Sequence, residues 1–311
     1  PNSLTAFLQS SLAAHPGASQ VILTLVGHGG GWSPELLADQ PSGHKSQPSE
    51  PTNIDGYDQL GGLLWDDHPG ASLSTPELAR ALAQVPPEVQ FEREHLIDLL
   101  YLDACSMAMA EVAYAVRNSV HYLLASPNTK WAHFPYDQHL NAITAARDAR
   151  AIGLEWLKHE QAGLDDLAGH PYTYSLIDVT RMDTLKNAMD DLSEALQDAL
   201  PTDRSTIAAA AAATTCYDSN LDGPIDAKDT YCDLAHFAEA LVGQFGATSD
   251  VSLAAQQVQQ TTQEAVVANV FANGSPWLYE DVTWTFDGAG GLSVFLPLGE
   301  DSWKRQFYGD R

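Results

Sequence analysis

Three short apolar runs constrain the fold of this 311-residue chain more than any other feature. They occupy residues 21–27 (VILTLVG), 96–104 (LIDLLYLDA) and 121–126 (HYLLAS). Such runs are typical of strands that are buried on both faces, as in a parallel sheet. Helical patterns at 76–84 and 106–118 lie between the runs. Alternating strands and helices predict an α/β fold with a mostly parallel central sheet.

The rest of the chain is predicted to be mainly helical. A further strand is expected at 172–179, and the segment 281–297 alternates and turns at Gly288–Gly291, which predicts a terminal β-hairpin. Residues 33–74, rich in Pro, Gly, Ser and Asp, are expected to form a long loop. Helices are expected at 3–14, 137–160, 181–199, 204–214, 233–243 and 250–271.

Composition restricts the function. The 15 basic and 41 acidic residues give a net charge of −26, which argues against binding to nucleic acid or to anionic membranes. The same charge suits a soluble extracytoplasmic or secreted protein, and it suits cation binding. No apolar run approaches the roughly 20 residues of a transmembrane helix, so no membrane span is expected.

Two of the apolar runs end in residues that can carry chemistry. The first ends at His28-Gly29, and the second ends at Asp103-Ala104-Cys105. In an open parallel sheet, ligands bind outside the carboxyl ends of the strands. A cysteine nucleophile needs a base nearby, and an imidazole is the usual one. We therefore predict a catalytic dyad of His28 and Cys105, with the N–H groups of Gly29 and Cys105 as oxyanion donors.

A helix that begins directly after Cys105 is also expected to lower the pKa of the thiol. Two alternatives accompany this prediction. A single His and a single Cys at strand ends are more often packing or loop residues than a dyad. The GHGGG sequence at 27–31 also fits the oxyanion loop of a lipase-like hydrolase, but that fold needs a G-x-S-x-G motif, which the sequence lacks.

VILTLVGHGGGW at 21–32, followed by LLYLDACSMAMAEVAYAV at 99–116, resembles the clostripain family of cysteine peptidases. That family belongs to the larger group of caspases, legumain and gingipains. Later segments resemble it too, at 123–131, 175–185 and 291–297. The resemblance implies a caspase-like α/β/α sandwich and a cysteine endopeptidase with the dyad His28–Cys105.

The sequence also departs from the family pattern. Ser106 stands where the family usually has a larger apolar residue, and the segment 126–136 lacks an acidic pair and a glycine that are often found there. Family members also carry first strands of the sheet ahead of the helix at 3–14. The chain, which begins with Pro1, is therefore expected to be a fragment or a processed form, and its own N-terminal segment is a possible partner chain. We expect a peptidase core at 1–180 and a helical region at 181–311 whose last strands pack on that core.

Asp103 precedes Cys105 by two residues. If both residues lie on one strand, their side chains face the same way. We predict that the Asp103 carboxylate lies in the first substrate pocket and favours cleavage after Arg, with Lys as the alternative, as the resemblance also implies. The alternative is an Asp that bonds the backbone or orients His28. A pocket for acidic residues would need an Arg cluster, which the sequence before Arg80 does not offer. Other candidate pocket residues are Trp131, Phe134 and Tyr136 as walls and Asp137 and Asp281 as replacement carboxylates.

Residues 218–229 (DSNLDGPIDAKD) have the spacing of an EF-hand-like calcium loop between helices, with Asp in place of Glu at its last position. The alternative is an acidic solvated loop. Cys216 and Cys232 flank the loop, and a disulfide between them would leave Cys105 free; two buried thiols are the other possibility. Predicted Ca²⁺ ligands are Asp218, Asn220, Asp222, the Pro224 carbonyl, Asp226 and Asp229.

The predicted function is therefore a calcium-dependent cysteine endopeptidase that acts on peptide or protein substrates. The alternatives are a non-catalytic calcium-binding protein that retains the fold, and a scaffold piece attached through the loop. Lys45 is the one Lys or Arg in residues 1–79. We predict that the bond Lys45–Ser46 is a self-processing site, with a flexible insertion as the alternative.

Overall fold

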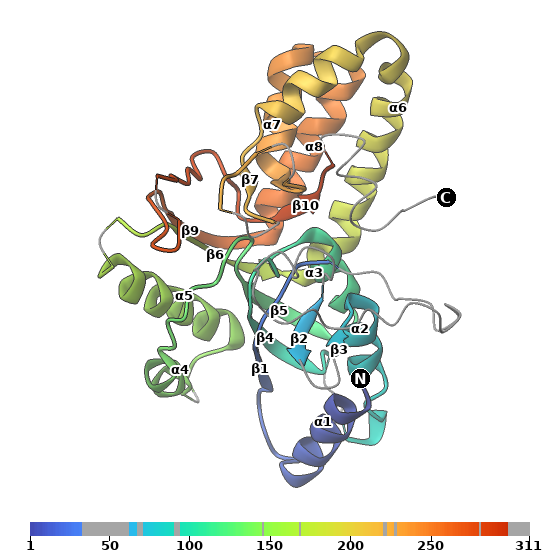
Figure 1. Ribbon diagram of the computed structural model, residues 1–311. Helices are drawn as coiled ribbons and strands as arrows, with labels where there is room; N and C mark the ends of the chain where they lie inside the picture. The colour runs from blue at the N-terminus through green and yellow to red at the C-terminus, as the bar shows by residue number, and fades with distance from the viewer. Residues whose placement is uncertain are drawn as a thin grey trace, which may run out of the picture.

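The computed structural model describes residues 1–32, 62–66, 71–89, 94–144, 146–167, 169–219, 223–226, 229–279 and 281–297. Its centre is a five-stranded sheet with the order β1-β4-β5-β6-β9 (Figure 1). Strands β1 and β4 pair in parallel, as do β4 and β5, whereas β6 runs antiparallel to both β5 and β9. Four of the five strands thus point the same way. Their bounds are Ile22–Val26 (β1), Ile97–Asp103 (β4), Val120–Ala125 (β5), Tyr172–Asp178 (β6) and Val266–Ala272 (β9).

Strand β4 shows why the sheet is covered on both faces. Leu100 and Leu102 belong to one buried apolar cluster, and Leu99 and Tyr101 belong to another. Because successive side chains of a strand point to opposite faces, each cluster lies on its own side of the sheet. The continuous apolar sequence of this strand therefore produces a three-layer sandwich, which confirms the predicted α/β class.

The helices divide between the two faces. The first cluster includes residues of α1, α2, α3, α6, α7 and α8, whereas the second includes residues of α5. Helices α6, α7 and α8 pack together above the sheet in Figure 1. The bounds are Asn2–Ala14 (α1), Thr75–Ala83 (α2), Ala110–Val116 (α3), Tyr136–Ala142 (α4), Ala149–Asp165 (α5), Met182–Ala212 (α6), Leu234–Phe245 (α7) and Asp250–Ala265 (α8).

Helix α6 joins two predicted helices into one. It contains Pro201, and the backbone of Asp203 leaves the helical range, which marks a kink. A proline inside a helix removes one hydrogen bond and bends the helix without ending it when neighbouring elements hold both halves. The predicted break between 199 and 204 is therefore a bend.

Two segments differ from the predicted elements. Residues 266–272 (VVANVFA) form strand β9 and do not continue the helix before them, because β-branched residues favour an extended strand beside β6. Within the predicted loop 33–74, the strands β2 (Leu63–Asp66) and β3 (Ala71–Leu73) pair with each other. Residues 33–61 of that loop lie outside the described part.

The last strand also differs from the expected hairpin. Strand β10 (Ser293–Phe295) pairs with β8 (Tyr231–Asp233), which pairs in turn with β7 (Cys216–Tyr217). Before the glycine-rich turn, Trp284 forms a single bridge to Gly274. The terminal segment therefore joins a second, three-stranded sheet instead of folding on itself.

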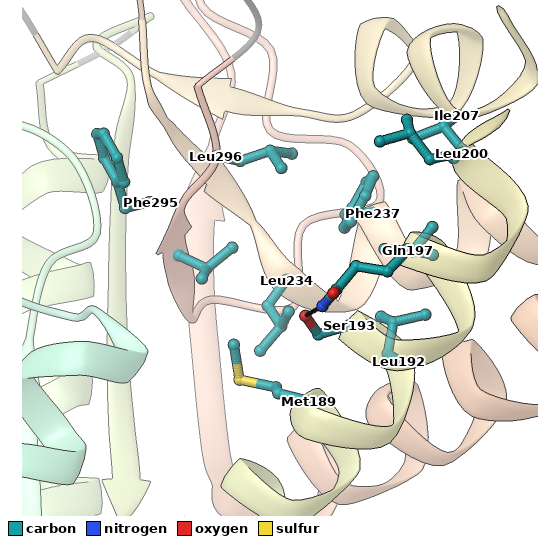
Figure 2. A pocket seen from close by; sticks show the side chains of 12 residues that line it. Met189, Leu192, Ser193, Gln197, Leu200, Ile207, Leu234, Phe237, Phe295 and Leu296 are labelled. Carbon is teal, nitrogen blue, oxygen red and sulfur yellow. Dashed lines mark hydrogen bonds between the residues drawn. The ribbon is translucent and has the colours of Figure 1, made fainter. Parts of the chain in front are cut away.

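An apolar groove lies between α6 and β10 (Figure 2). Its lining includes Leu192 and Leu200 on α6, Phe237 on α7 and Phe295 on β10. None of the predicted site residues contributes to it. Among the described helices, none combines the length and apolar character that crossing a membrane requires.

Burial of β4 predicts that alanine substitution lowers stability much more at a leucine of this strand than at an exposed leucine. Leu100 is fully buried, whereas Leu253 on α8 is 54% exposed. We expect Leu100→Ala to lower the free energy of unfolding by about 2–5 kcal/mol, because it removes core contacts and leaves a cavity. Leu253→Ala should change it by less than about 0.5 kcal/mol. Urea denaturation of both variants checks this, and similar losses in the two would contradict the assigned core.

Candidate active site

Parallel pairing brings the two predicted catalytic loops together. The last paired residues of β1 and β4 are Val26 and Asp103, and each chain continues for two residues to His28 and Cys105. A Cβ atom placed on Gly29 would lie 2.6 Å from the carbonyl oxygen of Cys105. The backbone after His28 therefore touches the backbone of the predicted nucleophile, and only glycine fits there. His28 is exposed, and Cys105 is half-buried.

Cys105 sits in a tight turn after β4. The next residue, Ser106, has a left-handed backbone with φ of 59°, and its N–H donates to the Asn128 carbonyl at 2.9 Å. A non-glycine residue in this region is strained and is held by its surroundings. The turn follows the end of β4 at Asp103 and precedes α3, which begins only at Ala110.

The prediction that a helix begins directly after Cys105 and lowers its pKa is therefore wrong. Burial instead raises the pKa of the Cys105 thiol, and the N–H of Lys130, 3.3 Å from Sγ, acts in the opposite direction. A buried site disfavours the charged thiolate. Activation of the thiol consequently depends on a base, not on a helix end.

The loop that carries His28 is fixed from two sides. The His28 carbonyl accepts from the N–H of Leu64 at 3.0 Å, so β2 pairs with this loop. On the other side, the Tyr231 hydroxyl donates to the Gly30 carbonyl at 2.7 Å. Gly31 has φ of 77°, and a Cβ there would lie 2.5 Å from the Tyr231 ring. These contacts hold the backbone of the His28 loop between β2 and Tyr231.

The carboxylate of Asp103 is buried and paired. Its Oδ1 lies 2.9 Å from Nζ of Lys130, and its Oδ2 accepts a hydrogen bond from the Tyr136 hydroxyl. The two charged side chains are 1% and 3% exposed. The partner of the Asp103 carboxylate is therefore a cation of the protein itself, and its predicted role in the substrate pocket stays a prediction.

A second buried carboxyl group lies near this pair. Glu160 Oε1 accepts a hydrogen bond from the Tyr101 hydroxyl at 2.6 Å and lies 3.7 Å from His139 Nε2. Burial raises the pKa of Glu160 to about 7, and burial lowers the pKa of His139 to about 4. At neutral pH the histidine is therefore uncharged, and burial favours the neutral form of the carboxyl group.

The remaining pocket candidates separate into two groups. Trp131 is buried, donates to the Pro171 carbonyl at 2.6 Å and stacks on Trp284, so it is a packing residue. Phe134 lies beside Lys130, with its ring centroid 4.5 Å from Nζ. Asp137 and Asp281 are exposed.

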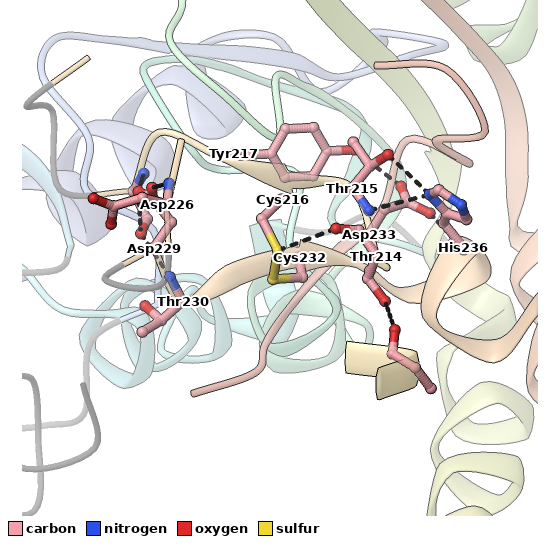
Figure 3. Close-up of a disulfide and its surroundings, with 12 residues drawn as sticks. Thr214, Thr215, Cys216, Tyr217, Asp226, Asp229, Thr230, Cys232, Asp233 and His236 are labelled. Carbon is pink, nitrogen blue, oxygen red and sulfur yellow. Dashed lines mark hydrogen bonds between the residues drawn. A yellow bond between two sulfur atoms is a disulfide. The ribbon is translucent and has the colours of Figure 1, made fainter. Parts of the chain in front are cut away.

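A disulfide joins Cys216 on β7 to Cys232 on β8, at the base of the predicted calcium loop (Figure 3). Cys105 is the free cysteine. Two short strands thus flank the loop directly, where helices are expected for an EF-hand. Asp229 is fully buried and accepts hydrogen bonds from the N–H groups of Ser219 and Asp226, at 2.7 and 2.8 Å, which close the loop.

The calcium site stays a prediction, and its expected donors differ in burial. Asp218 is also fully buried, whereas Pro224 and Asp226 are exposed. Within the described residues, no three His, Cys, Asp or Glu side chains gather in a group that could hold a metal ion. Asn220 and Asp222 lie outside the described residues, as do Lys45 and Ser46 of the predicted processing site.

The hairpin of β7 and β8 contacts both catalytic loops. The N–H of Asp218 donates to Asn128 Oδ1 at 3.1 Å, and the Asn128 carbonyl holds Ser106 beside the nucleophile. Tyr231, at the other end of the calcium loop, holds the loop of His28. Two hydrogen-bonded side chains, those of Asn128 and Tyr231, therefore connect the hairpin to these loops.

Fold and site together define a cysteine peptidase. The model of the clostripain family matches residues 1–310, and the chain belongs to this family. No curated protein matches the chain.

Solved structures share the fold at low sequence identity. One is a secreted C11 cysteine protease from Bacteroides thetaiotaomicron in complex with an irreversible peptide inhibitor, with a TM-score of 0.60 and 18% identity over 94% of this chain and 71% of that one. Another is an inactive zymogen C11 protease from Parabacteroides distasonis, with a TM-score of 0.59 and 19% identity over 96% and 71%. A third, the secreted C11 protease "iotapain" from Bacteroides thetaiotaomicron, has a TM-score of 0.64 and 14% identity over 98% and 75%.

Sequence reasoning missed the residues that surround the dyad. Lys130, Asn128 and Tyr231 lie far along the chain from the residues they hold, and no local pattern marks them. One signal was present for Lys130. It is one of only 15 basic residues in a chain with 41 acidic ones, and it follows the third apolar run closely.

The contact between Gly29 and Cys105 predicts that one added methyl group at Gly29 strongly lowers peptide hydrolysis. We expect Gly29→Ala to lower kcat/KM for peptide hydrolysis by at least about 100-fold, because the added Cβ displaces the turn of the nucleophile. Gly243 in α7 has open space around its Cβ position, so Gly243→Ala is the matched control and should leave hydrolysis unchanged. Full activity of Gly29→Ala would mean that the two loops do not meet as described.

Proposed function

We propose that the chain is a cysteine endopeptidase in which Cys105 is the nucleophile and His28 is its acid–base partner. The contact of Gly29 with the Cys105 backbone is the observation that carries this proposal, because it brings the two loops to one point. The exposure of His28 and the partial burial of Cys105 leave an approach for a peptide.

The reaction follows from these positions. His28 takes the thiol proton as Sγ of Cys105 attacks the peptide carbonyl carbon, and the N–H groups of Gly29 and Cys105 stabilise the oxyanion. The C–N bond breaks as His28 returns the proton to the leaving amine. Water then hydrolyses the thioester and regenerates the thiol.

Calcium binding at residues 218–229 is a second part of the proposal. All six predicted donors are oxygens from carboxylates, an amide and a carbonyl, which is the donor set that Ca²⁺ prefers. The hydrogen bonds from Asp218 to Asn128 and from Tyr231 to Gly30 give the loop a route to both catalytic loops. A bound cation would hold this hairpin, and the site it supports, in one arrangement.

Two finer predictions depend on the first substrate pocket. Cleavage after Arg or Lys requires a substrate cation at Asp103. A similar structure, a clostripain from Bacteroides thetaiotaomicron, is in complex with the peptide inhibitor BTN-VLTK-AOMK, whose peptide ends in Lys. In this chain Lys130 already pairs with Asp103. Self-cleavage at Lys45–Ser46 needs the same pocket to accept Lys, so both remain predictions that the charge of this pocket will decide.

An extracytoplasmic location is also proposed. The disulfide Cys216–Cys232 supports an oxidising compartment, since cytosolic proteins keep their thiols reduced. The similar proteases from Bacteroides thetaiotaomicron are described as secreted.

The dyad predicts loss of hydrolysis in two variants. Cys105→Ala should reduce cleavage of a fluorogenic peptide library to background, because no other group forms the thioester. His28→Ala should reduce kcat by about 10²–10⁴-fold. His15→Ala, on an exposed residue after α1, is the control and should retain full activity. Hydrolysis by Cys105→Ala above a few per cent of the wild-type rate would refute the mechanism.

The calcium proposal predicts a stability difference that does not require activity. At a free Ca²⁺ concentration of 100 Kd, the folded state should gain about 2.7 kcal/mol, and a chelator should lower Tm by several degrees. Asp226→Asn removes one predicted carboxylate and should reduce this shift. Asp191→Asn, on the exposed surface of α6, should not. Equal Tm values with Ca²⁺ and with chelator in the wild-type protein would exclude the site.

A further inference from the structure

The ion pair of Lys130 and Asp103 lies immediately beside the nucleophile. Lys130 approaches Cys105 with its main chain, because its N–H lies 3.3 Å from Sγ. Its side chain reaches back to Asp103, two residues before the cysteine, at 2.9 Å. One residue therefore contacts both the reacting sulfur and the carboxylate that was expected to bind the substrate.

The ammonium group of Lys130 has several partners within the protein. Besides Asp103, it donates to the His133 carbonyl, and it lies 4.5 Å from the ring centroid of Phe134. The second oxygen of Asp103 accepts from Tyr136. Both charges are thus enclosed by protein groups, and the side chains are almost inaccessible to solvent.

A cationic substrate side chain gains no favourable charge interaction with the Asp103 carboxylate while Lys130 is paired with it. Two cations beside one buried carboxylate repel each other, and displacing Lys130 would leave a buried ammonium group without its counter-charge. The other nearby carboxyl group, Glu160, is engaged with the Tyr101 hydroxyl. The two carboxyl groups near Cys105 therefore offer a basic substrate side chain no unpaired negative charge.

We propose that Lys130 determines the specificity of this peptidase: its ammonium group takes the place of a basic substrate side chain at Asp103, so the enzyme prefers an uncharged residue before the cleaved bond. The proposal rests on the proposed function, because it concerns the substrate pocket of the same Cys105 site. It also predicts that removal of this one side-chain charge converts the enzyme into one that favours Lys or Arg.

A matched pair of peptides tests this directly. The two fluorogenic substrates differ only in the residue before the cleaved bond, which is Lys in one and norleucine, the same chain without the amine, in the other. For the wild-type enzyme, we expect kcat/KM to be at least about 10-fold higher for the norleucine peptide. In Lys130→Met the ratio of Lys to norleucine hydrolysis should rise by at least about 30-fold, as for the gain of one charge-assisted hydrogen bond.

Two further variants serve as controls. Lys130→Met combined with Asp103→Asn removes both charges of the pair, should fold because neither charge is left alone, and should lose the gain on the Lys peptide. Lys158→Met changes a lysine whose side chain is 70% exposed and should leave the ratio unchanged. Circular dichroism melting curves establish that each variant is folded.

Several outcomes would overturn the proposal. They are a wild-type preference for the Lys peptide, a wild-type preference for a matched acidic peptide, or an unchanged ratio in a folded Lys130→Met. If Lys130→Met does not fold, the wild-type ratio alone decides. Loss of hydrolysis of every peptide, in the wild type as in Cys105→Ala, would instead refute the proposed function and this inference with it.

Discussion

The parallel pairing of β1 with β4 is the constraint on which the site depends. It aligns Val26 with Asp103, so both strands end at the same edge of the sheet. His28 and Cys105 each follow two residues later. Close contact at Gly29 then brings the two loops together. The sandwich on both faces fixes this register, because a slip by one residue would turn the side chains of β4 toward the wrong cluster.

The sequence was sufficient to predict the strands β1, β4 and β5 and to place His28 and Cys105 after the ends of two paired strands, because local patterns mark these features. Continuous apolar runs identify buried strands, and each run ends in a residue that can do chemistry. Predictions at element ends were weaker. A turn at residues 104–109 separates Cys105 from α3, because Ser106 adopts a left-handed backbone. No local sequence pattern predicts this conformation. Strand β9 was mistaken for helix because its partner, β6, lies about ninety residues away in the chain.

The surroundings of the dyad escaped sequence analysis for the same reason. Asn128, Lys130 and Tyr231 act across long sequence separations, and only the fold shows what each one holds. The Asp at 103 was expected to meet a substrate, yet its charge is compensated internally. A residue type at the right position thus identifies a pocket, whereas the charge that the pocket offers depends on its neighbours.

The proposed mechanism depends on Cys105 as the nucleophile, and one measurement tests this directly. An irreversible peptidyl acyloxymethyl ketone with norleucine next to the reactive group is incubated with the wild-type protein, and the modified residue is located by peptide mass spectrometry. The proposed mechanism predicts one label, on Cys105, and far slower labelling in His28→Ala. A label on any other residue, or equal labelling of Cys105 with and without His28, would contradict it.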